Sequence, residues 1–126
     1  MAEEDISIVK VRDVLLVTLP SSPSDRVIDK LQDKVLTKMA DYNMKKVIID
    51  IKLVEVVDSF FARLIEETAQ MISLMGGTTV ISGMQPSVAV TATELGLSFG
   101  GTKTALSVES ALNLLSETKS LDNGKT

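Results

Sequence analysis

Ser59 is the residue whose type and position suggest the most specific chemistry in this chain. It stands in the run VVDSFFA of residues 56–62, where a buried apolar segment gives way to an amphipathic pattern. A hydroxyl at a helix start can cap the helix or accept a phosphate, because unpaired backbone N–H groups and the helix dipole stabilise negative charge there. From this pattern alone, capping by Asp58 or Ser59 and phosphorylation of Ser59 both remain open.

A phosphate on Ser59 would change the local charge more than the local fold. It would add about -1.5 to -2 charge, which the start of a helix accepts without distortion. Arg63, one turn later, would partly neutralise that charge, whereas Asp58 would oppose it. We therefore expect the effect to fall on partner binding, through repulsion or desolvation, and we expect Asp58 to help present the hydroxyl.

The composition removes most alternative chemistry. The 126 residues contain no cysteine and no histidine, which excludes thiol nucleophiles, disulfides, cysteine–histidine zinc sites and the commonest general base. A Mg²⁺ site built from carboxylates alone stays open. A net charge of -4 and 3% aromatic residues argue against nucleic-acid binding. We expect a chain without enzymatic activity or cofactor.

The chain also lacks the signals of membrane proteins. No apolar run approaches the roughly 20 residues that span a bilayer, and the first residues, MAEED, are acidic, unlike a signal peptide. The sequence therefore predicts a cytoplasmic protein that contacts neither membrane nor nucleic acid. Its length fits one domain, and 44% hydrophobic residues can supply a core.

Asp50 is the second candidate, as the phosphoacceptor of a receiver-like domain. It lies near the end of a buried apolar run, and Lys103 would be the lysine that such a site requires after the last strand. The site also requires a pair of acids after the first strand to hold Mg²⁺. Glu3, Glu4 and Asp5 precede that strand instead, so the pattern favours a structural role for Asp50.

The first third of the chain predicts a hairpin and a helix. Residues 6–10 and 14–19 are rich in β-branched residues and flank Arg12-Asp13, although the glycine usual in tight turns is missing. A helix is predicted over about residues 23–42. Its start signals are Ser22 as cap, Pro23 at the first position and Asp25 three residues after the cap. Its core stripe is predicted to be Val27, Ile28, Leu31, Val35 and Met39.

The middle third predicts a central strand followed by a second helix. Residues 46–51 form a continuous apolar run, typical of a strand covered on both faces. The helix is predicted from Ser59 to about Met75 and ends at Gly76-Gly77. Its apolar face is predicted to be Phe61, Leu64, Ile65, Thr68, Ile72 and Met75. Its opposite face is predicted to be Arg63, Glu66, Glu67 and Gln70.

The last third predicts two strands and two helices. Residues 78–82 form the next strand, and Pro86 opens a short helix that ends before Gly96. Residues 97–103, which Gly100-Gly101 interrupts, are interpreted as a short edge strand. The last helix is predicted to have Ser107 as its cap, and Val108, Ala111, Leu112 and Leu115 define its apolar positions.

The order of these elements predicts the fold class. The succession β-β-α-β-α-β-α-β-α is typical of an α/β domain with a mixed, mostly parallel sheet of about five strands and about four helices. We expect a single domain over residues 1–126, with an ordered core at about 5–118. The polar tail, 119–126, is expected to fray from Lys119 onward.

Four short motifs, in this order and spacing, resemble the STAS domain of bacterial anti-sigma-factor antagonists over roughly residues 5–118. The segment from Gly83 to Gly96 is particularly similar to the small, single-domain members of that family that form stressosomes. The motifs are Val47-Ile48-Ile49-Asp50, Val57-Asp58-Ser59-Phe60, Leu74-Met75-Gly76-Gly77 and Ile81-Ser82-Gly83-Met84-Gln85-Pro86.

The resemblance implies a non-catalytic scaffold and phospho-switch. It implies that an RsbT-like serine kinase phosphorylates Ser59, that the unmodified chain sequesters this kinase until stress, and that an RsbX-like phosphatase resets the site. It also implies assembly with RsbR-like STAS paralogues in a large pseudo-icosahedral particle, and homo-oligomers. The implied partner-binding residues are Asp58, Ser59, Phe60, Arg63, Glu66, Glu67 and Gln70.

Two threonines and two rival functions complete the expectations. Thr91 aligns with a threonine that is phosphorylated in RsbR-like proteins, but that modification is not carried over to this chain. Thr91 and Thr93 are interpreted as helix threonines with ordinary packing roles. One rival function is a simple anti-sigma-factor antagonist that acts without a large particle. The other is the receiver-like phospho-aspartate domain that would use Asp50.

Overall fold

The computed structural model describes residues 5–55, 57–99 and 102–125, with residues 117–125 through their backbone only. Outside the described residues lie Val56 of the run VVDSFFA, Gly100-Gly101 of the predicted edge strand, and Glu3 and Glu4 of the receiver alternative.

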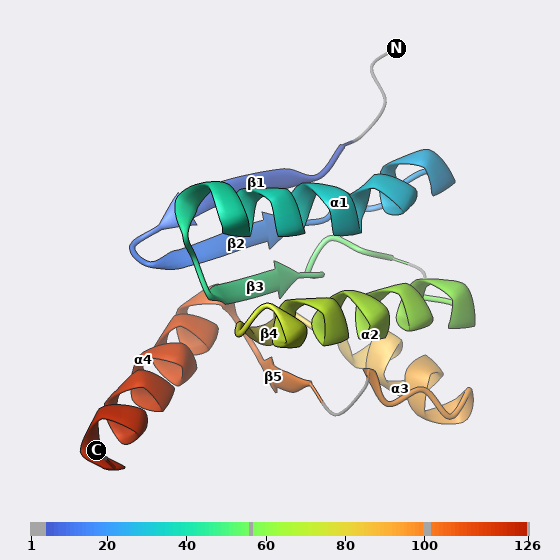
Figure 1. Ribbon diagram of the computed structural model, residues 1–126. Helices are drawn as coiled ribbons and strands as arrows, with labels where there is room; N and C mark the ends of the chain where they lie inside the picture. The colour runs from blue at the N-terminus through green and yellow to red at the C-terminus, as the bar shows by residue number, and fades with distance from the viewer. Residues whose placement is uncertain (1–4, 56, 100–101, 126) are drawn as a thin grey trace.

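The described strands form one mixed sheet in the order β1-β2-β3-β4-β5. β1 pairs antiparallel with β2, and every later pair is parallel. Figure 1 shows β1 at one edge of this sheet and β5 at the other. The predicted fold class is therefore confirmed. The strands are β1 (Ser7–Val11), β2 (Val14–Thr18), β3 (Lys46–Asp50), β4 (Thr78–Ser82) and β5 (Lys103–Ala105).

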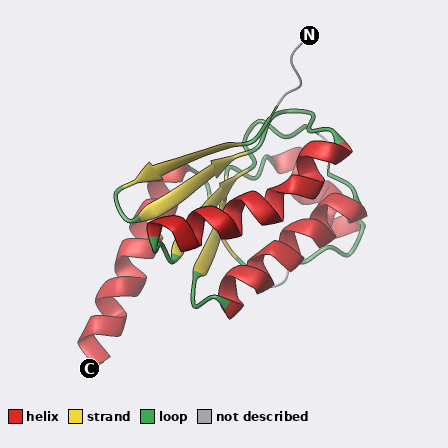
Figure 2. Ribbon diagram, turned by 45° about the horizontal axis from the view of Figure 1, so that its top comes forward, coloured by secondary structure: helices red, strands yellow, loops and turns green. Residues whose placement is uncertain are grey.

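The helices cover the two faces of the sheet unequally. In Figure 2, α1 and α2 lie in front of the sheet and α4 lies behind it. The larger cluster of buried side chains lies under α1 and α2, and a smaller one joins α4 to the sheet. The helices are α1 (Asp25–Tyr42), α2 (Ser59–Leu74), α3 (Pro86–Glu94) and α4 (Val108–Lys125).

The hairpin turn between β1 and β2 forms without glycine. Val11 pairs with Val14, which leaves Arg12 and Asp13 as the two loop residues. Arg12 adopts a left-handed φ of 57°, the conformation that a glycine would supply in such a turn. Asp13 is held by an ion pair of 2.9 Å with Lys46 at the start of β3.

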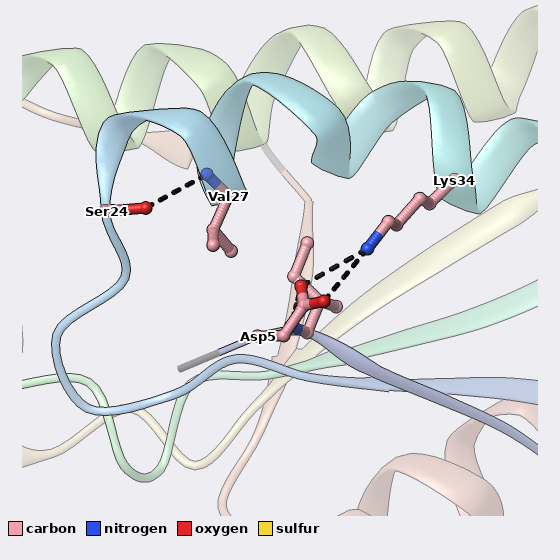
Figure 3. Close-up of polar contacts among 5 residues, drawn as sticks. Asp5, Ser24, Val27 and Lys34 are labelled. Atoms are coloured by element: carbon pink, nitrogen blue, oxygen red, sulfur yellow. Dashed lines mark hydrogen bonds and ion pairs between the residues drawn. The ribbon is translucent and has the colours of Figure 1, made fainter. Parts of the chain in front are cut away.

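Helix α1 begins two residues later than the predicted start, and its predicted cap is wrong. Ser24, not Ser22, is the N-cap, and its Oγ accepts a hydrogen bond of 3.2 Å from the Val27 N–H (Figure 3). The delay has a cause distant in sequence, because the Ser21 carbonyl accepts from the Glu55 N–H at 3.2 Å and holds the preceding segment in place. All five residues of the predicted core stripe are buried.

The end of helix α2 corrects the predicted apolar face. Met75 is 41% exposed, because the last helical residue is Leu74 and the chain turns away through Gly76, whose φ is 83°. Ala62, which was not among the predicted positions, lies in the core and is 1% exposed. The other five predicted positions of this face are buried.

The strand predicted over residues 97–103 lies later, at Lys103–Ala105. Residues 97–99 instead close over the end of α3, where the Leu97 N–H donates to the Ala92 carbonyl at 2.8 Å and Phe99 is buried. Burial of that ring took precedence over strand pairing. The predicted cap of α4 is confirmed, since Ser107 Oγ accepts from the Ser110 N–H at 3.1 Å.

The backbone of α4 is helical to Lys125, past the predicted start of the polar tail at Lys119. Fraying of the tail from Lys119 onward concerns motion, so it stays a prediction.

Candidate functional site

Asp58 caps α2 and thereby fixes the position of Ser59. The Asp58 carboxylate accepts a hydrogen bond of 2.8 Å from the Phe61 N–H, and its carbonyl accepts from the Ala62 N–H at 3.0 Å. Asp58 has an extended backbone, with φ -114° and ψ 178°, as an N-cap residue requires. Capping, one of the two roles open for this pair, therefore belongs to Asp58.

Ser59 is the first residue of α2 and its side chain is exposed. Within the described part of the chain, no group forms a hydrogen bond with its hydroxyl. The residues around it in the chain anchor this helix start in the core, because Val57, Phe61 and Ala62 are all buried. The hydroxyl is thus unengaged but held in a fixed place by a capped helix start.

Apolar side chains are exposed close to Ser59 in the chain. Phe60 follows it directly and is 51% exposed, and Leu53 in the β3–α2 loop is 54% exposed. Aromatic residues that are partly open to solvent are enriched at protein interfaces. These two side chains give the start of α2 an apolar component that the charge pattern of the helix did not indicate.

The four residues predicted on the outer face of α2 point toward different neighbours. Arg63 is exposed and forms no ion pair with any described residue. Glu66 accepts from Ser98 Oγ at 3.3 Å, beyond α3, whereas Glu67 lies near α1, where Gln32 Nε2 is 3.5 Å away.

Gln70 and Glu66 share a shallow hollow of about 380 Å³ between α2 and the β4–β5 side of the sheet. Glu66 and Glu67 therefore lie on opposite flanks of α2. Of the four predicted residues on the outer face, Arg63 is the nearest to Ser59 in the chain.

Asp50 has structural partners. Its Oδ1 accepts from Ser82 Oγ at 3.0 Å and from the Lys52 N–H at 3.3 Å. Gly83 packs against the same oxygen so closely that a Cβ there would lie 2.7 Å from it. These contacts tie the ends of β3 and β4 together, which supports the structural interpretation of Asp50.

The structure does not bring Lys103 to Asp50. Asp50 pairs with Ser82 and Ser82 with Ala105, so Lys103 lies two positions before the level of Asp50, at the start of β5. Among residues 5–55, 57–99 and 102–125, no three acids gather in a group that could hold a metal ion.

The threonines of α3 occupy unremarkable places. Thr91 is half-buried and its carbonyl accepts from the Leu95 N–H at 3.0 Å, whereas Thr93 is exposed. In the same described ranges, no helix has the length and apolar character needed to cross a membrane.

A hollow of about 580 Å³ at the carboxyl end of the sheet was not predicted from the sequence. It is lined by Asp50, Gly83, Gln85 and Ser107, among others, and the Gln85 amide donates to the Lys52 carbonyl at 3.1 Å. The signal available in the sequence was Gly83 directly after a buried strand, since a glycine there often marks a close backbone approach.

The chain belongs to the STAS domain family, whose family model matches residues 5–111. Within that family, it is similar to the stressosome protein RsbS. A serine-to-glutamate variant of Moorella thermoacetica RsbS superposes with a TM-score of 0.79 at 32% identity, over 90% of this chain and 97% of that one. A chain of a solved structure that describes the molecular architecture of the stressosome superposes with a TM-score of 0.78 at 33% identity, over 90% of this chain and 98% of that one.

A curated relative adds an RsbR-type similarity. The RsbT co-antagonist protein RsbRD of Bacillus subtilis (strain 168) is 34% identical over 80 residues, which are 64% of this chain. The matched region is 29% of that relative, so the chain spans less than a third of its length.

Proposed function

We propose that this chain is a phospho-switch and scaffold of the stressosome type, in which Ser59 is the phosphorylated residue. The observation that carries the proposal is the division of tasks at the start of α2. Asp58 supplies the cap, and Ser59 presents an exposed hydroxyl without a partner among the described residues. A serine needed as the cap would lose that bond on modification, whereas this serine has none to lose.

The chemical step belongs to a kinase, and this chain supplies only the acceptor. Ser59 Oγ attacks the γ-phosphorus of ATP, a new P–O bond forms, the bond to the leaving ADP breaks, and the hydroxyl proton passes to a base of the kinase. The product is a phosphate ester at the first position of a helix. The helix dipole favours the added negative charge there, and Arg63 lies one turn further on.

The added charge is expected to act on a bound partner. The unmodified site combines an exposed Phe60 with an uncharged hydroxyl, which a partner can cover at little desolvation cost. A phosphate that Arg63 neutralises only in part costs more to cover than a hydroxyl. Phosphorylation of Ser59 therefore weakens the complex and releases the partner.

The proposed partners rest on the relatives and on the family resemblance. The name of RsbRD describes a co-antagonist of RsbT, and an RsbS chain and a stressosome chain share this fold at above 30% identity. We propose an RsbT-like serine kinase as the partner that Ser59 controls, RsbR-like STAS paralogues as neighbours in a large complex, and an RsbX-like phosphatase for the reset. The proposed contact surface is Asp58, Ser59, Phe60, Arg63, Glu66, Glu67 and Gln70.

Mass spectrometry after incubation with the cognate kinase and ATP tests the proposal. We expect one added phosphate, located on Ser59, and none on the Ser59→Ala chain. Ser87→Ala is the matched control, because Ser87 is also an exposed serine in the first turn of a helix. Phosphate on another residue of the unaltered chain, with Ser59 unmodified, would refute the assignment.

Binding to the kinase supplies the second half of the test. The Ser59→Ala chain is expected to bind the kinase and never release it on addition of ATP, whereas Ser59→Asp is expected to bind weakly. Equal affinity of the unaltered and Ser59→Asp chains would contradict the proposed release mechanism, even if Ser59 is the modified residue.

A further inference from the structure

β1 presents an open edge of the sheet. It is the terminal strand and pairs only with β2, so one side of Ser7–Val11 has no strand beside it among the described residues (Figure 1). An edge of this kind carries unpaired N–H and C=O groups and is a template for pairing with another chain. Proteins usually protect such edges with bulges, prolines or outward charges.

Those protections are missing from β1. Its register with β2 is continuous from Ser7 to Val11, without a bulge, and the strand contains no proline. Lys10 is its one charged residue. The Lys10 ammonium lies 4.6 Å from the centre of the Tyr42 ring of α1. The charge is therefore directed toward α1 and not outward from the edge of the sheet.

The acids that flank β1 are also held within the molecule. Asp5 accepts from the Ile6 N–H at 2.7 Å and forms an ion pair of 3.2 Å with Lys34 of α1 (Figure 3). Asp13 pairs with Lys46 in the same way. The two acids that flank β1 are therefore neutralised within the molecule, in a chain whose net charge is -4.

An apolar strip adjoins this edge on the face that α1 does not cover. Ile8 packs into the cluster under α1, so Val9 and Val11, one and three residues later, point to the opposite face. Val9 is 49% exposed and lies beside Leu16 of β2. On that face α4 packs mainly over β3, β4 and β5 and also buries Val14 of β2, whereas Val11 and Leu16 are half-buried.

We propose that β1 pairs antiparallel with β1 of a second copy of this chain, about a two-fold axis at Val9. A two-fold axis makes the pairing self-complementary, so each strand satisfies the other's open groups. Centring on Val9 gives all five residues a partner, places Ser7 opposite the second copy's Val11, and joins the two apolar strips. It also brings the second copy's Arg12 to Ile6, next to Asp5.

This inference goes beyond the proposed function and does not depend on it. One pair of five-residue strands and a narrow strip bury less than the roughly 800 Å² per partner of standard interfaces, so we expect a dimer with a dissociation constant of about micromolar order. In a larger assembly, the same contact would act beside others.

Cysteine cross-linking tests the contact directly, because the natural chain contains no cysteine. Residues directly opposite each other in antiparallel strands have Cα atoms about 4.5–5.5 Å apart, which a disulfide can bridge. With diamide as the oxidant, most of a Val9→Cys chain should become a covalent dimer. Ser7→Cys should not, because two-fold pairing at Val9 separates the two Ser7 positions by four residues. The combined Ser7→Cys and Val11→Cys chain should cross-link.

Two controls make the outcome decisive. Leu106→Cys places a thiol on an 89% exposed residue far from the edge and should stay monomeric. Val9→Lys should raise the dissociation constant in sedimentation equilibrium by roughly tenfold or more, because like charges then face each other across the axis. The inference is overturned by equal cross-linking of Val9→Cys and Leu106→Cys, by cross-linking at Ser7 alone, or by dimerisation that Val9→Lys leaves unchanged. Ser59→Ala should cross-link through Val9→Cys as before, so failure here is distinct from failure of the phospho-switch.

Discussion

Asp58 and Ser59 have different roles at the start of α2. The Asp58 carboxylate accepts a hydrogen bond from the Phe61 N–H and caps α2. Ser59, the first residue of the helix, has an exposed hydroxyl that the cap does not use. Residue types alone left the division open, because aspartate and serine are about equally good N-caps. The backbone conformation of Asp58 decides it.

This division predicts unequal effects of two substitutions. Asp58→Ala should lower the free energy of unfolding by about 1 kcal/mol, because the cap is lost. Ser59→Ala should change it by less than about 0.5 kcal/mol, as is usual for exposed side chains without a structural role. Urea unfolding followed by circular dichroism measures both. Asp58→Asn, which keeps a capping oxygen, is the control and should retain most of the stability. A larger loss for Ser59→Ala than for Asp58→Ala would contradict the assignment of the cap.

At the scale of elements, the loops after β3 and β4 constrain each other. Gly83 leaves β4 with a φ of 77° and passes within contact distance of Asp50, so the loops after β3 and β4 pack directly on each other. A side chain at this position meets both a conformational and a steric obstacle. The same loops lead into α2 and α3, and their packing sets where those helices begin.

Gly83→Ala is therefore predicted to be more destabilising than Gly96→Ala. Both glycines have positive φ, but a Cβ at Gly83 would lie 2.7 Å from Asp50 Oδ1, while a Cβ at Gly96 meets nothing within 4 Å. Gly96→Ala should cost about 1 kcal/mol from its backbone conformation alone, and Gly83→Ala should cost clearly more. Thermal unfolding of the two variants compares them, and equal losses would show that the close approach at Asp50 is unimportant.

The elements also show where sequence patterns suffice. The five-residue stripe of α1 and the apolar run of β3 were predictable, because periodicity reports which side of an element faces the core. The start of α1 and the position of β5 were not, since they depend on contacts distant in sequence, the Ser21–Glu55 hydrogen bond and the burial of Phe99. At the candidate site, the position of Ser59 was predictable, but the flanks toward which Glu66 and Glu67 point depend on Ser98 and Gln32.

At the scale of the whole molecule, the sheet separates two surfaces. Ser59 follows the loop after the carboxyl end of β3, whereas the open edge is β1, at the far side of β2. If both proposals hold, the chain contacts its neighbours and its kinase through different regions. Assembly and release then need not compete for the same residues.

Size-exclusion chromatography with an RsbR-like partner tests the assembly. The unaltered chain mixed with that partner should elute as a particle far larger than either protein alone, and Ser59→Ala should form the same particle. Elution of the mixture as small complexes only would favour the simple antagonist. The chain alone provides the control for self-association.

The capped start of α2 has a consequence for how long a signal lasts. If Ser59 is phosphorylated on a helix that Asp58 already caps, the phosphate replaces no structural hydrogen bond. No conformational change of the helix then favours its removal. Phosphate monoesters are among the most inert bonds in biology without a catalyst. The chain would then stay phosphorylated until a phosphatase hydrolyses the ester. The duration of a response would be set entirely by the abundance of that phosphatase and by its access to Ser59.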